Sequence, residues 1–106
     1  MLYKDLSHSD KKKYKAAGAK MKREYAAAFN AAADKAPGLA RPLFEKLRDA
    51  SRSSDRVVEY LDAYDNISRL AETDPGTKKI FDQLLSETKK TSDRWGAAVR
   101  PLFGLH

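Results

Sequence analysis

The sequence contains no cysteine and only two histidines among its 106 residues. Without cysteine the chain has no disulfide framework and no thiolate ligands for a metal ion. The histidines, His8 and His106, stand near the two ends of the chain, where solvated side chains are expected rather than catalytic ones. We therefore predict that the protein is not an enzyme and uses no cofactor and no metal.

Long apolar stretches are also missing. No run approaches the ~18 apolar residues that a membrane span needs, and the first residues do not form a signal peptide. We expect a protein that is cytoplasmic or carried within a particle, is not secreted and has no membrane partner.

Glycine is scarce and scattered, and no glycine-rich phosphate loop appears. The sequence Gly76-Thr77-Lys78 matches only the tail of such a loop, without its leading glycine or a preceding strand. The carboxylates Glu59, Asp62 and Asp65 recur every three residues, but no Glu-x-x-His pair accompanies them, as it does in the metal sites of helical bundles. They are therefore expected on a solvated face.

Helical spacing dominates what is present. Between residues 10 and 36, apolar and small residues lie within about 60° of one line on a helix, which predicts one buried stripe. The stripe consists of Tyr14, Ala17, Gly18, Met21, Tyr25, Ala28, Phe29, Ala32 and Ala36. Ser7, Ser9 and Asp10 are candidate caps at its start, and Pro37-Gly38 ends the helix.

Three more helices follow by the same criteria. They are expected over residues 42–51, from about residue 55 to about residue 73, and from residue 75 to Pro101. The third helix is expected to bury Val57, Tyr60, Leu61, Tyr64, Ile67 and Ala71, and the fourth Ile80, Phe81, Leu84, Leu85, Thr88, Trp95, Ala98 and Val99. No stretch shows the alternation of a strand.

These elements predict an all-α protein, a small antiparallel helical bundle of three long helices and one short helix. The whole chain, residues 1–106, is expected to form a single domain. Residues 1–8 are expected to be a flexible N-terminus and residues 101–106 an apolar C-terminal tail.

The net charge of +6 is concentrated at one end of the chain. Residues 1–23 hold eight Lys and Arg and two Asp, so they carry the whole excess, and residues 24–106 are neutral. A positive pole on a neutral body is typical of a protein that binds an anionic partner.

Our first hypothesis is a basic binding protein whose first helix docks without sequence specificity on nucleic acid or another polyanion, an acidic protein surface included. The contact residues would be Lys11, Lys12, Lys13, Lys15, Lys20, Lys22 and Arg23, with Lys4 secondary. Among the nearby tyrosines only Tyr3 lies outside the buried stripe and is free for base stacking. The same lysines also fit a surface kept basic for solubility.

The alternative hypothesis is a structural or adaptor subunit of a larger assembly or homo-oligomer, by analogy with small basic helical proteins of phage-like genomes. Residues 55–74 hold six carboxylates and two arginines, so the third helix is acidic. The protein contacts would come from this helix and from the tail, through Glu59, Asp62, Leu102, Phe103 and Leu105. The tail either packs on its own bundle or inserts into a groove of a partner.

Overall fold

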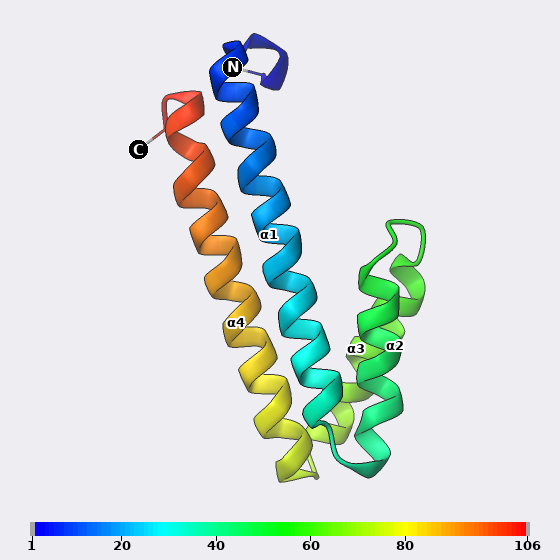
Figure 1. Ribbon diagram of the computed structural model, residues 1–106. Coiled ribbons are helices and arrows are strands. Elements are labelled where there is room, and N and C mark those ends of the chain that lie inside the picture. Colours follow the sequence, from blue (N-terminus) through cyan, green and yellow to red (C-terminus); the bar gives the residue numbers. More distant parts are fainter. Residues whose placement is uncertain (1, 106) are drawn as a thin grey trace.

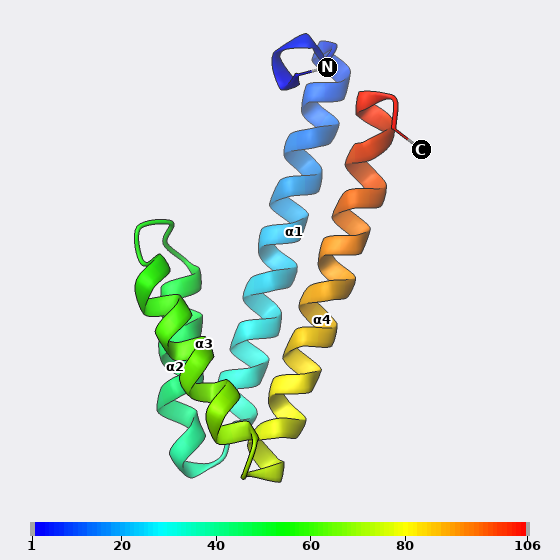
Figure 2. The ribbon, with the colours of Figure 1, turned by 180° about the vertical axis from the view of Figure 1, so that it is seen from behind.

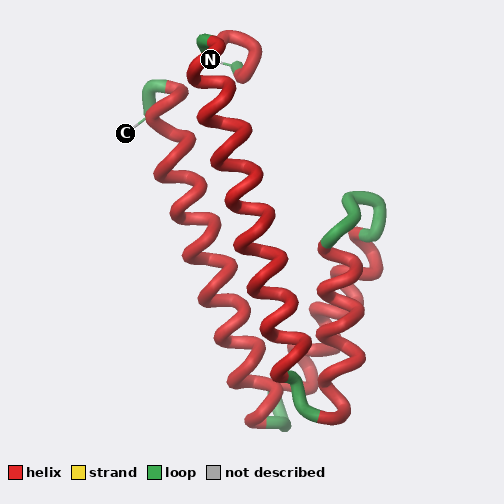
Figure 3. Tube along the Cα trace, viewed as in Figure 1, coloured by secondary structure: helices red, strands yellow, loops and turns green. Residues whose placement is uncertain are grey.

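The structure is a computed structural model that describes residues 2–105, and that part of the chain contains helices and no strand (Figures 1 and 3). Met1 and His106, at the ends of the two predicted terminal segments, lie outside the described residues. The α-helices are α1 (His8–Lys35), α2 (Arg41–Ser51), α3 (Val57–Ala71) and α4 (Pro75–Val99), and the short 3-10 helices are η1 (Tyr3–Asp5), η2 (Gly38–Ala40) and η3 (Arg100–Phe103). The predicted all-α bundle is confirmed.

The four α-helices are of unequal length, and this sets the shape of the molecule. Helices α1 and α4 have 28 and 25 residues and run antiparallel, side by side, along the whole molecule (Figures 1 and 2). Helices α2 and α3, with 11 and 15 residues, form a hairpin that covers only one end of this pair. The third helix is therefore shorter than the roughly 20 residues that the sequence pattern suggested.

The molecule is elongated as a result, with extents of 49 × 26 × 19 Å. Its radius of gyration is 16.3 Å, whereas a compact chain of this length would have about 13 Å. We call the half where all four helices overlap the closed end, and the half where α1 and α4 pair alone the open end.

Local chemistry explains where the helices start and stop. The Ser7 hydroxyl accepts a hydrogen bond of 3.1 Å from the backbone N–H of Asp10, so Ser7 is the cap and α1 starts two residues before the predicted Asp10. Pro75 occupies the first turn of α4, where its missing N–H costs nothing. Pro37 follows α1, and Pro101 directly follows α4 and its cap Arg100.

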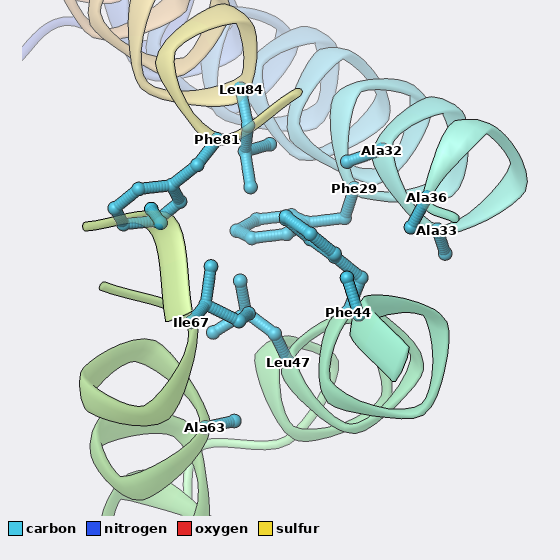
Figure 4. Packing of buried hydrophobic residues seen from close by; sticks show 12 residues of the cluster. Phe29, Ala32, Ala33, Ala36, Phe44, Leu47, Ala63, Ile67, Phe81 and Leu84 are labelled. Atoms are coloured by element: carbon cyan, nitrogen blue, oxygen red, sulfur yellow. The ribbon is translucent and has the colours of Figure 1, made fainter. Parts of the chain in front are cut away.

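The hydrophobic core fills the closed end (Figure 4). Phe29, Phe44, Ile67 and Phe81 come from the four different helices and meet there with Leu47 and Leu84. Ala32, Ala33 and Ala36 are buried beside them, and their small side chains let α2 approach α1 closely. The outer alanines of the same stretch, Ala26, Ala27 and Ala31, are exposed.

The buried face of α3 is not the predicted one. Val57 and Leu61 were expected in the core, but 56% and 57% of their surfaces are exposed, while Ala63 is buried instead. Helix α3 packs on α2 as well as on α4, which turns its buried face toward Ala63 and Ile67. In α4, Leu85 and Ala98 are likewise exposed rather than buried.

At the open end, aromatic side chains pack between α1, α4 and the two terminal segments. The ring centroid of Tyr14 lies 5.2 Å from that of Tyr3, 6.3 Å from that of Trp95 and 6.0 Å from that of Phe103. Tyr3 therefore packs against Tyr14 at a tilted angle while 38% of its surface stays exposed, and the tail residue Phe103 packs on its own bundle. The predicted flexible segment 1–8 contains η1 and the buried Leu6 in its described part.

Candidate functional site

All seven predicted contact residues lie on the part of α1 that reaches toward the open end, and we call them the basic surface. They are Lys11, Lys12, Lys13, Lys15, Lys20, Lys22 and Arg23. Lys11 is half-buried, and its ammonium lies 5.7 Å from the centroid of the Tyr3 ring, a cation–π contact. The other six are exposed.

The protein's own carboxylates hardly neutralise the basic surface. Within residues 2–105 only Lys13 forms an ion pair, with Asp10 at 4.0 Å, and both groups remain accessible to solvent. The only other carboxylate on this part of α1 is Glu24, which accepts a hydrogen bond of 3.0 Å from Arg94 of α4. This hydrogen bond from Arg94 holds the pKa of Glu24 below its ordinary value. Glu24 thus ties α1 to α4.

The basic surface surrounds much of the helix, but three of its members form a row. At 100° per residue, Lys11, Lys15 and Lys22 fall within about 40° of one line along α1. The row continues toward Phe29 and Ala33, on the side of α1 that the α2–α3 hairpin covers further along. One edge of the basic surface therefore leads directly to the hairpin.

At that point the structure contains an open groove of about 800 Å³ that the sequence did not predict. Its walls come from all four α-helices and from Arg52 and Ser53 of the connection between α2 and α3. The Arg52 guanidinium also donates a hydrogen bond of 3.1 Å to the side-chain oxygen of Asn30 on α1. The apolar part of its lining is Tyr25, Ala26, Phe29, Leu47, Ala50, Val57, Tyr60, Tyr64, Leu84 and Leu85. Lys22, Arg52 and Lys89 also line it, and no carboxylate does.

The tyrosines of the groove are held by one another and by their neighbours. The hydroxyls of Tyr25 and Ser92 form a hydrogen bond between α1 and α4. The rings of Tyr60 and Tyr64 are stacked with centroids 6.5 Å apart, and Phe29 meets Tyr60 edge-on at 6.2 Å. Burial raises the pKa of the Tyr60 phenol, and the nearby Tyr64 and Tyr25 add to the effect.

This shift has a consequence for stability at high pH. Because the folded pKa lies above the ordinary value of 10.0, the contribution of Tyr60 is complete below about pH 10 and is lost as the pH rises through the folded pKa. We expect Tyr60→Phe to lose less unfolding free energy than the wild type as the pH rises above about 10, measured by denaturant titration. An identical pH dependence in both proteins would contradict the assignment.

The acidic residues of α3 lie on its exposed face. Glu59 pairs with Arg56 and Asp65 with Arg69, each within the helix or its first turn. Asp62 forms no ion pair within residues 2–105 and is exposed. The basic surface and this acidic face are therefore both directed to solvent rather than paired with each other.

The three predicted contact residues of the tail differ in their exposure to solvent. Leu102 and Phe103 lie in η3 and are half-buried against the open end, whereas Leu105 is exposed. Of the three predicted contact residues of the tail, only Leu105 is thus largely accessible.

The histidine, metal-binding and phosphate-loop sites considered in the sequence were also compared with the described residues. His8 is exposed in the first turn of α1, and residues 2–105 hold no group of three or more His, Asp or Glu placed to bind a metal ion. The segment Gly76-Thr77-Lys78 forms the first turn of α4, where the buried Thr77 hydroxyl donates a hydrogen bond to the Asp74 carboxylate. It is a helix start rather than a phosphate loop.

None of the helices between residues 2 and 105 has the combined length and apolar character of a membrane span. Compared with models of protein families, with curated protein sequences and with solved structures, the chain matches none of them.

Proposed function

We propose that the protein is a non-enzymatic binding protein that docks on nucleic acid or a similar polyanion through the basic surface. The observation that carries the proposal is that six of its seven cations form no ion pair within residues 2–105. Cations that the fold leaves without carboxylate partners remain available for phosphates, and releasing counterions from a polyanion favours such contacts.

The proposed binding does not read sequence. Lysines on a helix surface contact phosphates, which position a protein on nucleic acid but carry no sequence information. The aromatic rings near the basic surface are already engaged, Tyr3 and Tyr14 with each other and Tyr60 with Tyr64. Base stacking therefore has no place in the proposal, and duplex and single strands should bind by the same phosphate contacts.

A salt titration of binding to mixed-sequence duplex DNA tests the proposal. The row formed by Lys11, Lys15 and Lys22 supplies at least three phosphate contacts, so log K should fall against log salt with a slope of about −2.7 or steeper. This corresponds to at least ~40-fold weaker binding at 200 mM than at 50 mM salt. Absence of binding at low salt, or a flat response, contradicts the proposal.

A second candidate function, that of a subunit in a protein assembly, is favoured by a different observation. Large apolar side chains at the start of α3, those of Val57, Val58 and Leu61, remain exposed next to the acidic residues Glu59 and Asp62. A contiguous exposed apolar patch with a charged border is typical of a protein–protein contact. The exposed Leu105 would add to such a contact.

A further inference from the structure

The exposed start of α3 adjoins the groove. Val57 belongs to the lining of the groove, and Val58 and Leu61 follow on the same two turns of α3 with 71% and 57% of their surfaces exposed. Leu85 of α4 is exposed on the opposite wall of the groove. Single exposed apolar residues are ordinary, but here two of them, Val57 and Leu85, line one concave site, and Val58 and Leu61 lie on the same turns of α3 as Val57.

The charges of these two neighbouring surfaces are complementary. Of the three cations in the groove lining, Lys89 pairs with Asp93 and Arg52 with Asp49, which leaves Lys22. On the exposed face of α3, Glu59 and Asp65 are paired with arginines, which leaves Asp62. Lys22 in the groove and Asp62 on α3 both lack an ion-pair partner in the described chain. Each surface therefore presents a free charge of the sign that the other one needs.

We propose that a second copy of this chain lays its α3 over the groove, forming a dimer with two-fold symmetry. Because the groove and the exposed face of α3 are adjacent in one molecule, a two-fold axis beside α3 brings each α3 to the groove of the other copy. Such a contact is isologous and closes on itself. Leu61 and Val58 enter the partner's groove, and Asp62 meets the partner's Lys22.

The chemistry of the groove also fits other amphipathic anions, such as an acidic helix of another protein or a fatty acid. The second copy is favoured because this chain itself carries a helix with both required properties, exposed apolar side chains and a free carboxylate. Nucleobases fit less well, because Tyr60 and Tyr64 are stacked on each other, Phe29 meets Tyr60 edge-on and the Tyr25 hydroxyl is hydrogen-bonded to Ser92.

Sedimentation equilibrium of the full chain, from about 1 µM to 1 mM at physiological salt, measures the dimer directly. We expect a reversible monomer–dimer equilibrium that Leu61→Glu weakens at least about tenfold, because two buried leucines are lost per dimer. The matched control is Leu39→Glu, the same change at a leucine that is 85% exposed and does not line the groove. The control should leave the equilibrium unchanged.

Charge exchange tests the orientation. Lys22→Glu alone and Asp62→Lys alone each place like charges in contact and should weaken the dimer about fivefold or more. An equimolar mixture of these two variants should restore it, because in the mixed dimer both contacts join opposite charges. The double variant should also dimerise, with the wild-type net charge of +6.

Several results would overturn the proposal. A monomer over the whole concentration range excludes the dimer, and mass growth beyond a dimer excludes two-fold closure. A dimer that is insensitive to Leu61→Glu, or a mixture that does not recover, places the contact elsewhere. Binding of an acidic helical peptide to a protein that stays monomeric assigns the groove to a foreign helix. The Leu61→Glu and Asp62→Lys results do not bear on polyanion binding, since Leu61 and Asp62 lie outside the basic surface. Lys22 belongs to both surfaces, so Lys22→Glu is used only to measure dimer formation.

Discussion

Phe44→Ala is expected to lower the free energy of unfolding by about 3–5 kcal/mol, the cost of removing a buried phenylalanine and leaving a cavity. Phe44 is 1% exposed and projects from α2 into the core, toward Phe29 of α1 and close to Ala33 and Ala36 (Figure 4). Alanine neighbours have no side-chain freedom with which to fill the space. The cavity should therefore persist, and the cost should reach the upper part of this range.

The loss is large for this fold because the core is confined to the closed end. Domains of this size are stabilised by only about 5–15 kcal/mol in total. The open end is a two-helix pair and offers no second core of comparable size to compensate. Urea titration followed by circular dichroism measures the change.

Leu39→Ala serves as the matched control for Phe44→Ala. Leu39 is highly exposed in η2, so its truncation should change the free energy of unfolding by less than about 0.5 kcal/mol. A loss of less than about 1 kcal/mol for Phe44→Ala would contradict the packing of α2 on α1 that Figure 4 shows.

Replacing Lys11, Lys12 and Lys15 together by glutamate is expected to weaken nucleic-acid binding on the order of a hundredfold or more at low salt. Each lost phosphate contact also removes about 0.9 from the magnitude of the salt slope, so the slope should become shallower by about 2.7. Glutamate is a good helix former, so α1 should persist. Fluorescence anisotropy with a labelled duplex at several salt concentrations gives both quantities.

The control for this variant reverses three lysines elsewhere, Lys35, Lys46 and Lys79. All three are exposed and form no ion pair within the described part of the chain, and reversing them also brings the net charge from +6 to zero. Binding through the basic surface predicts that the control retains most of its affinity. Equal losses in the two variants would show that net charge alone matters and would contradict a localised surface.

The secondary structure could be predicted from local features of the sequence. Ser7 was among the candidate caps for α1, and the fourth helix was predicted to start at residue 75, where Pro75 begins α4. Capping and proline geometry depend on a few adjacent residues, so they are present in the chain before any packing occurs. The location of the excess charge in residues 1–23 is likewise a property of the sequence alone.

The direction of the apolar faces could not be predicted in the same way. Helical spacing places Val57, Leu61 and Tyr64 on one stripe, but it does not say which neighbour covers which part of that stripe. The two helices that pack against α3 are α2 and α4. They cover a face of α3 centred nearer Ala63 and Ile67, so Val57 and Leu61 remain exposed. Burial depends on the partner helix, which periodicity does not identify.

The sequence alone thus specified an all-helical chain, the approximate ends of its four main helices and a positive segment at its start. The tertiary structure decided that α2 and α3 cover only one end of the α1–α4 pair and that a groove opens beside Lys22. It also left Lys13 as the one cation of the basic surface with an ion pair within residues 2–105. The physical reason is that helix ends arise from contacts between near neighbours in the chain. A groove or a free charge arises from the relative lengths and angles of helices that are distant in the sequence.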